Sequence, residues 1–301
     1  MVIVNVLFSP LARSGNAAAI ERVTGFAAQH HARLTLLGVV PEPSRLQLML
    51  QSAEDVRSAV ETAVDDLESE LQQWCRDPVV VDREGIVAVG DPTTTILEHL
   101  RRGHADLLAV TADAGRIQDP AIRRLLHLCP TPVWVMKPPH DSGHGVVAAV
   151  DADPDEFDLN MAILDQAVDL HRLVGGELHV VHAWEFYAEA QLRHSAFIHP
   201  SGSTIDAMLG DEHDEHLARL ESLIAASPHA DAPWVVHLLR GRPDEVITRF
   251  IDDHGIDLVV LGTIARRGLP GLVIGNTADR VLAEAPCSML AIKPPWFEAT
   301  W

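Results

Sequence analysis

The feature of this sequence that most constrains its fold is an internal duplication. Residues 4–10 (VNVLFSP) and 147–154 (VAAVDADP) both read as buried strands, each followed by a helical pattern and a second apolar strand. The match resumes at GDPTTTILEHLRRGHADLLAV, from Gly90, and GRPDEVITRFIDDHGIDLVVLG, from Gly241. Both halves end alike, in PVWVMKPP and CSMLAIKPP. Self-similarity of this kind indicates that the chain folds as two copies of one unit.

Within each half, short apolar runs rich in β-branched residues alternate with helices of period 3.6. This alternation is typical of a parallel sheet covered by helices on both faces. Residues 54–75, EDVRSAVETAVDDLESELQQWC, place their apolar side chains on one stripe and predict a long amphipathic helix. Each half has room for five strands and about four helices. We therefore expect an α/β fold of two doubly wound, Rossmann-like domains that bind ligands at the carboxyl ends of their strands.

The boundary between the two domains is predicted in the loop from Lys137 to Gly145, KPPHDSGHG, which is rich in proline and glycine. The expected division is an N-terminal domain over 1–140, a C-terminal domain over 145–296 and an aromatic tail over 297–301. The last strands, VWVM and MLAI, can pair with each other and so form a pseudo-dimer within one chain. A further homodimer is left open.

Composition limits the classes of function. The chain has 47% hydrophobic and 22% charged residues and a formal net charge of −20, as expected of an acidic globular protein. This charge opposes binding to nucleic acid, which relies on lysine and arginine, and no apolar run is long enough to span a bilayer. We see no export signal before the first strand. Three separated cysteines, Cys75, Cys129 and Cys287, are expected to be reduced, so a cytoplasmic protein is favoured.

A glycine-rich stretch, GTIARRGLPGLVIGNTADR, runs from Gly262 to Arg280, between the apolar run IDLVVL and a helix that we expect to start near Asn276. A strand, loop and helix in this order can hold a phosphate on backbone N–H groups and on the positive end of the helix. For an isolated loop, the alternative is an ordinary turn followed by a helix cap.

The duplication favours the phosphate site. Ala105 matches Ile256, 151 positions further on, whereas Lys137 matches Lys293, 156 positions further on. The second half therefore carries five extra residues in this loop alone. The first half reads TADAGRIQDPAIRRLLHLCP and holds one glycine there, Gly115, so it cannot form the same cradle.

These motifs resemble those of the universal stress protein family in its tandem, two-domain form. The family pattern is a strand, G-x2-G-x9-G-[S/T], a helix and a last strand ending in V-x-K-P, with VDxS after the first strand. The resemblance covers about residues 1–296. It implies a five-stranded sheet per domain in the order 3-2-1-4-5, with the last strands of the two domains meeting edge to edge. It also implies a role in the stress response and an ATP-binding site.

The resemblance places that site in the second half, where Asp151 matches the acidic residue that meets the nucleoside and Ala183 the position that contacts adenine. Ala265 replaces the second glycine of the pattern, where a methyl group disfavours a positive φ, and Asn276 replaces its serine. Phe8 stands where Asp151 stands in the second half, so we expect the first copy to be a degenerate partner. The expected nucleotide- and phosphate-binding residues are Asp151, Ala183, Leu261, Gly262, Thr263, Ala265, Arg266, Gly275, Asn276 and Thr277.

Two groups of charged residues near this site allow two interpretations each. Arg266 and Arg267 either contact ligand phosphates, which suit the guanidinium group, or are solvated surface charges. Asp151 and Asp153 either hold a ribose hydroxyl or a divalent ion, such as Mg²⁺ bound with a nucleotide, or cap a helix near Pro154.

The connection over residues 185–212 is far longer than its counterpart in the first half, and inserts after the carboxyl end of a strand often form lids. Its apolar side chains either pack on the protein, face a ligand with an apolar part, or bind another protein. A helix is expected to start near Asp211. His213 and His216, three apart, are weak metal candidates, but no third ligand is visible and we expect no metal site.

The sequence contains no nucleophile elbow, P-loop or zinc hydrolase motif, and we name no catalytic residue. We therefore expect a stress-response module whose C-terminal domain binds an ATP-like nucleotide or another phosphorylated ligand, with little or no catalysis. Two alternatives stay open. One is a protein-interaction module that uses residues 185–212 independently of nucleotide, and the other is a slow ATPase.

Overall fold

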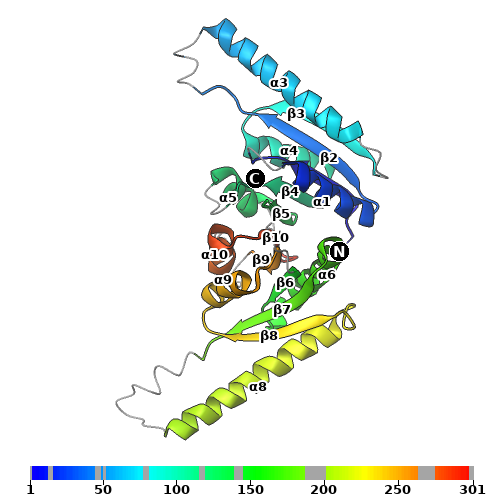
Figure 1. The fold of residues 1–301 in the computed structure, drawn as a ribbon. Coiled ribbons are helices and arrows are strands. Elements are labelled where there is room, and N and C mark those ends of the chain that lie inside the picture. The colour runs from blue at the N-terminus through cyan, green and yellow to red at the C-terminus, as the bar shows by residue number, and fades with distance from the viewer. Residues whose placement is uncertain are drawn as a thin grey trace.

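The computed structural model describes residues 2–12, 16–44, 49, 52–76, 81–114, 119–138, 145–186, 201–263 and 275–297. In these residues ten strands form one sheet, in the order β3-β2-β1-β4-β5-β10-β9-β6-β7-β8 (Figure 1). Each half therefore has the predicted order 3-2-1-4-5. The strands are β1 Asn5–Ser9, β2 Arg33–Val40, β3 Arg83–Val89, β4 Leu107–Thr111, β5 Val133–Met136, β6 Gly145–Val150, β7 Glu177–Trp184, β8 Trp234–Arg240, β9 Leu258–Gly262 and β10 Ser288–Ile292.

Helices connect the parallel strands. The amphipathic helix predicted over residues 54–75 is confirmed as α3. The helix expected near Asp211 starts earlier, at Gly202, because Ser201 caps it by accepting the N–H of Thr204. The helices of the described residues are α1 Asn16–Gln29, α3 Ala53–Arg76, α4 Pro92–Gly103, α5 Pro120–Leu128, η1 Pro154–Glu156, α6 Phe157–Val174, α8 Gly202–Ala226, α9 Pro243–His254 and α10 Asn276–Glu284.

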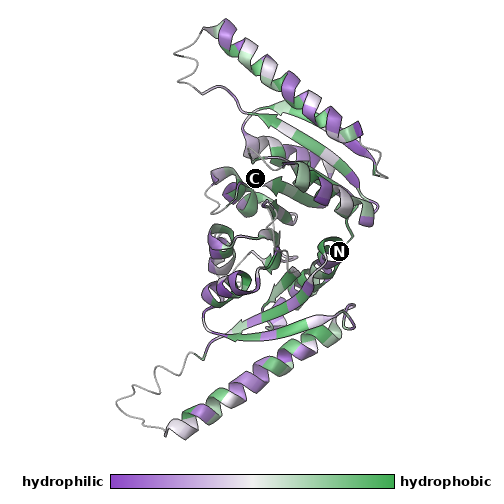
Figure 2. Cartoon of the chain, in the orientation of Figure 1, coloured by the Kyte–Doolittle hydropathy of each residue, from purple (hydrophilic) through white to green (hydrophobic). Residues whose placement is uncertain are grey.

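The helices cover both faces of the sheet and enclose two apolar cores. Side chains of α1, α3, α6 and α8 pack on one face, and those of α4, α5, α9 and α10 pack on the other. Because both faces are covered, the central strands are continuously apolar, as β6 shows with all six residues buried. In Figure 2 the long helices α3 and α8 carry many hydrophilic residues, in keeping with their position along the outer strands β3 and β8.

The two halves are joined by their last strands. β5 and β10 pair antiparallel, with Trp134 opposite Leu290 and Val135 opposite Met289. All other strand pairs of the described sheet are parallel. The pairing confirms the pseudo-dimer expected from the sequence, and it covers a strand edge of each half that would otherwise be exposed.

The sheet register corrects one alignment made from the sequence. Phe8 pairs with Leu36 on β2, and Ala148 makes the equivalent pairing with Val180 on β7. Phe8 is therefore equivalent to Ala148, and the residue at the place of Asp151 is Leu11. The alignment was wrong because the connection from β6 to α6 includes the short helix η1, which the first half lacks in its described residues. Leu11 is apolar, so the first half still has no acidic side chain at this position.

Two buried lysines cross the junction between the halves. Lys137 and Lys293 follow β5 and β10 and are only 3% and 8% exposed. The Nζ of Lys137 donates to the carbonyl of Ala285, and that of Lys293 donates to the carbonyl of Leu126. Burial disfavours the charged form of both side chains and lowers their pKa values, that of Lys293 to about 8.

The pKa of Lys293 predicts a pH dependence of stability. An unfolded lysine keeps its proton up to about pH 10.5, whereas the folded Lys293 releases it near pH 8. Between these values the unfolded chain binds more protons, so this group makes the folded state more stable as the pH rises. We expect the unfolding free energy of the wild type, relative to Lys293→Met, to rise by up to about 3 kcal/mol from pH 8 to pH 10.5. Urea denaturation at both pH values measures it, and a constant or falling difference contradicts it.

Candidate ligand-binding site

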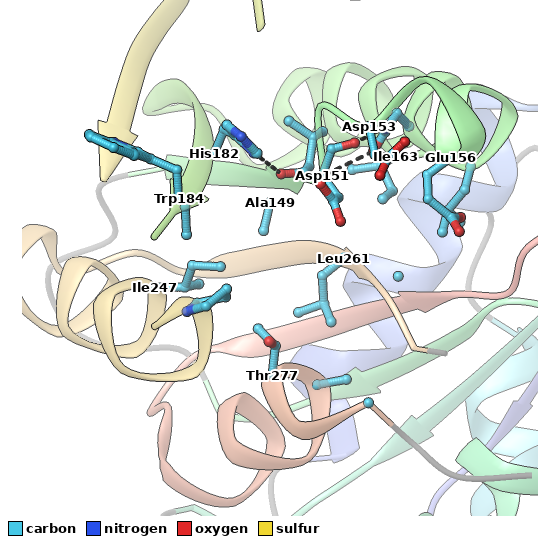
Figure 3. A pocket seen from close by; sticks show the side chains of 18 of the residues that line it. Ala149, Asp151, Asp153, Glu156, Ile163, His182, Trp184, Ile247, Leu261 and Thr277 are labelled. Carbon is cyan, nitrogen blue, oxygen red and sulfur yellow. Dashed lines mark hydrogen bonds between the residues drawn. The ribbon is translucent and has the colours of Figure 1, made fainter. Parts of the chain in front are cut away.

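A cavity of about 580 Å³ opens in the C-terminal half, at the carboxyl ends of β6, β7 and β9. Residues of η1, of helices α6, α8 and α9, and of the first turn of α10 complete its wall. Figure 3 shows Asp151 and Asp153 on one side of the cavity and Thr277, at the start of α10, on the other. The strand order reverses between β6 and β9, and this switch point is where doubly wound sheets bind ligands.

The structure brings most of the predicted site residues to this cavity. Thr263 does not line it: its buried hydroxyl donates to the carbonyl of Ile292, and its own carbonyl accepts the N–H of Gly275 at 2.8 Å. Thr263 thus fixes the start of α10. Ala265, Arg266 and Arg267 lie outside the described residues. The predicted residues that line the cavity are Asp151, Ala183, Leu261, Gly262, Gly275, Asn276 and Thr277.

The N-terminus of α10 faces the cavity, and no side chain among the described residues caps it. Gly275 is the N-cap residue, in an extended conformation, and it has no side chain to accept the N–H groups of the first turn. The first N–H groups of a helix have no partner inside the helix and carry its partial positive charge. The equivalent helix of the first half, α5, is closed: Asp119 accepts the N–H of Ala121 at 2.7 Å, and Pro120 occupies the first helical position.

A second contrast lies at the end of the fourth strand of each half. Gly262 ends β9, and a Cβ atom there would lie 2.8 Å from Cδ2 of Leu159, which lines the cavity. The equivalent residue of β4 is Thr111. Its hydroxyl accepts the N–H of Leu11 at 3.0 Å and donates to Asn16, which ties the loop after β1 to the strand end. Glycine at this position leaves room for the side chain of Leu159 in the second half, whereas the first half has a threonine side chain there.

Asn160 positions the backbone of Asp151. The amide of Asn160, which is 1% exposed, accepts the N–H of Asp151 at 3.1 Å and donates to its carbonyl. Asp151 is thereby fixed at the rim of the cavity (Figure 3). Asp153 accepts the N–H of Asp155 and caps η1, which agrees with the helix-capping interpretation of this residue. Neither the sequence nor its resemblance to a family pointed to Asn160.

Two histidines form one side of the cavity. Nε2 of His182, on β7, lies 2.9 Å from Nδ1 of His216, on α8, and Nδ1 of His182 lies 3.1 Å from the carbonyl of Val150. Burial lowers the pKa of His182, which favours the neutral ring at pH 7. A neutral ring has one donor and one acceptor: Nδ1 is the donor when it bonds the carbonyl of Val150 and the acceptor when it bonds the N–H of Ala152, which lies 3.3 Å away. Nε2 takes the complementary role toward His216. The ring of Trp184 lies against His216, with centroids 5.5 Å apart.

Sequence analysis missed His182 and Trp184 and interpreted His216 only as a weak metal candidate with His213. His213 instead lies 3.1 Å from Asp214, and the described residues contain no group of three or more side chains arranged to hold a metal ion. A signal was present: the register places His182 where β2 has Gly38, and a ring at that position of a buried strand differs clearly from glycine.

The fold and the cavity define a tandem α/β protein with a cavity at the switch point of the C-terminal half of its sheet. Residues 8–137 and 146–293 each match the universal stress protein family, so the chain belongs to this family. The architecture and the match confirm the resemblance seen in the sequence. Within the described residues, no helix is both long and apolar enough to cross a membrane.

Individual relatives agree with this assignment. Universal stress protein E of Photorhabdus laumondii is 28% identical over 69% of this chain and 67% of its own length. A homologue of universal stress protein E in Haemophilus influenzae is 25% identical over 91% of this chain and 87% of its own length. A crystal structure of a Pseudomonas aeruginosa protein of unknown function has the same fold, with a TM-score of 0.68 at 22% identity over 97% of this chain and 93% of that chain.

The contacts of Asn160 predict a stability cost at this site. Asn160→Ala leaves the partly buried N–H and carbonyl of Asp151 without this partner, and we expect the unfolding free energy to fall by about 1–3 kcal/mol. The matched control is Asn16→Ala, because the amide of Asn16 also makes two hydrogen bonds beside the first strand of its half, with the hydroxyl of Thr111 and the carbonyl of Ala12, from a more exposed position. Urea denaturation of both variants measures the difference. An equal or greater cost for Asn16→Ala contradicts the role given to Asn160.

Proposed function

We propose that this protein is a ligand-sensing module of the stress response whose C-terminal domain binds a nucleotide, or another phosphorylated ligand, in the cavity at the switch point. The observation that carries the proposal is the difference between the two equivalent helix ends. In the first half, the N-terminus of α5 is occupied by Asp119 and Pro120, whereas that of α10 opens on the cavity behind Gly275.

The proposed orientation of the nucleotide follows from the side chains and N–H groups that line the cavity. The phosphates lie at the first turn of α10, where N–H groups and the helix dipole favour negative charge. The nucleoside lies toward Asp151, whose carboxylate can accept hydrogen bonds from ribose hydroxyls, and toward Ala183 on β7. Trp184 and His216 extend this wall with aromatic surface.

The charge of the cavity bears on how phosphates enter it. Among its described lining residues are several carboxylates and one arginine, Arg219, so a bare anion meets repulsion. We propose that Mg²⁺ accompanies the phosphates and that Arg266, in the loop outside the described residues, contributes positive charge. Mg²⁺ commonly binds through one or two carboxylates together with substrate phosphates.

Other parts of the expected function stay predictions. We propose a cytoplasmic location and little or no catalysis, with slow ATP hydrolysis as the alternative. The alternative of a protein-binding surface over residues 185–212 is also untested, because residues 187–200 lie outside the described part of the chain. Further partners, including a second copy of the chain, are not required by the proposal.

The two halves supply a sharp test. The double substitution Gly275→Asp with Asn276→Pro gives α10 the N-terminus of α5. Gly275 has φ −60° and ψ 146°, and Asp119 has φ −66° and ψ 117°, so the new residues fit the existing backbone. We expect the fold to remain as stable as the wild type, because an aspartate cap and a proline at this position both favour a helix start.

We expect ligand affinity to fall, because the new carboxylate takes up N–H groups and repels phosphate. Isothermal titration with ATP, ADP and AMP in the presence of Mg²⁺ should show binding about tenfold weaker than in the wild type. The reciprocal variant, Asp119→Gly with Pro120→Asn, is the matched control and should lose stability but not affinity. If the wild type gives no binding heat with any of these nucleotides, or if the α10 variant binds as tightly as the wild type, the proposal fails. Phosphate release measured on the same samples tests slow hydrolysis.

A further inference from the structure

The chain contains only two lysines, and the fold buries both at the junction between the domains. Lys137 belongs to the N-terminal domain, yet its Nζ donates to the carbonyl of Ala285, the C-cap residue of α10 in the C-terminal domain. The last carbonyls of a helix have no partner inside the helix and carry its partial negative charge, so an ammonium group there both pairs and stabilises them. The N-terminal domain thus contacts the far end of the helix whose near end faces the cavity.

The N-terminal domain also holds the first turn of α10. Nη1 of Arg123, on α5, donates to Oδ1 of Asp279 at 2.5 Å. The two residues are 156 positions apart, the same offset as between Lys137 and Lys293, so they occupy equivalent positions of the duplicated chain. Equal charges at these facing positions would repel each other. The two copies instead carry opposite charges and form an ion pair across the pseudo-twofold axis.

These contacts matter because α10 is short. A helix of nine residues spans about 14 Å and is not stable by itself in water, so its position depends on its tertiary contacts. Within its own domain, Arg280 binds Asp244 of α9 at 3.3 Å, and the apolar side chains of Ala278, Val281 and Leu282 are buried. Arg123 and Lys137 add two contacts from the other domain, one at each end of the helix.

The C-terminal domain makes a similar contact with α5 of the N-terminal domain, but α5 does not face the cavity. Nζ of Lys293 donates to the carbonyl of Leu126 near the end of α5 and lies 4.6 Å from the ring centroid of Phe297. The N-terminus of α5 is already occupied by Asp119 and Pro120. The two lysines therefore make similar structural contacts, but only Lys137 acts on a helix that opens on the cavity.

We propose that the N-terminal domain positions the ligand-binding helix of the C-terminal domain, with Arg123 and Lys137 holding α10 so that its first N–H groups face the cavity. Both are positioning residues that do not contact the ligand. The expected effect on ligand binding rests on the proposed function, whereas the effect on the position of α10 does not. It gives the copy without a ligand site a defined role, which is to order the site of the other copy.

The first experiment measures α10 without any ligand. Hydrogen exchange of the full chain should show the amides of residues 277–284 exchanging about tenfold faster in Arg123→Gln and in Lys137→Met than in the wild type. The matched controls are Arg124→Gln and Lys293→Met. Arg124 is the neighbour of Arg123 and lies 3.9 Å from Asp91 of its own domain. We expect neither control to change exchange in α10, and Lys293→Met to accelerate exchange in α5 instead.

The second experiment measures the consequence for the site. Isothermal titration with ADP and Mg²⁺ should show affinity falling about fivefold to tenfold in Arg123→Gln and in Lys137→Met. Arg124→Gln and Lys293→Met should bind as the wild type does. Arg123→Lys keeps a positive charge opposite Asp279 and should restore most of the affinity, which a loss of packing alone would not do.

The outcomes separate the two proposals. If exchange in α10 is the same in all variants, the positioning role is overturned, whatever the wild type binds. If exchange rises but ADP affinity does not change, α10 is held for stability alone and the inference is likewise overturned. If the wild type binds none of ATP, ADP and AMP while α10 exchange rises, the proposed function fails and the contacts from the N-terminal domain stand. Should Lys137→Met not fold, the pair Arg123→Gln and Arg124→Gln decides, because both side chains are more than a third exposed.

Discussion

The antiparallel pairing of β5 with β10 is the interaction on which the rest of the molecule depends. It joins two five-stranded sheets into one and removes the edge that each would otherwise expose. It also brings the last helix of each half against the other half. The contacts of Lys137 with α10 and of Lys293 with α5 are possible only because these strands meet. The helix α10, whose first turn faces the cavity, therefore also contacts the N-terminal domain.

The two copies of the duplicated unit differ in how they treat the N-terminus of their last helix. A helix start needs partners for its first N–H groups. In α5 the chain supplies them itself, through Asp119, whereas in α10 the N-cap is Gly275 and the cavity lies in front. The strand ends also differ, since the hydroxyl of Thr111 ties its strand end to the loop after β1, whereas Gly262 has no side chain and packs against Leu159. In the first copy the chain's own side chains occupy these positions, whereas in the second copy a cavity lies there.

Much of this fold could be predicted from the sequence, because repeats and periodicity are local features. The five strands per half and the pairing of the last strands are confirmed by the sheet, and the strand order came from the family resemblance. Phe8 was aligned wrongly because sequence alone does not reveal that η1 lengthens one connection. The contacts of His182 with His216, and of Asn160 with Asp151, were missed because they join residues on different elements. The sequence alone does not show which partner a buried histidine or asparagine contacts in the fold.

The burial of both lysines has a chemical consequence for the whole chain. A protein of this size usually presents many primary amines to solvent, but here both side-chain amines are enclosed where the two sheets join. Acylation, methylation and attachment of a carrier protein all require an accessible amine on the modified side chain. The folded chain is thus a poor substrate for lysine-directed modification. Reaction at Lys137 or Lys293 would report that the two domains had separated.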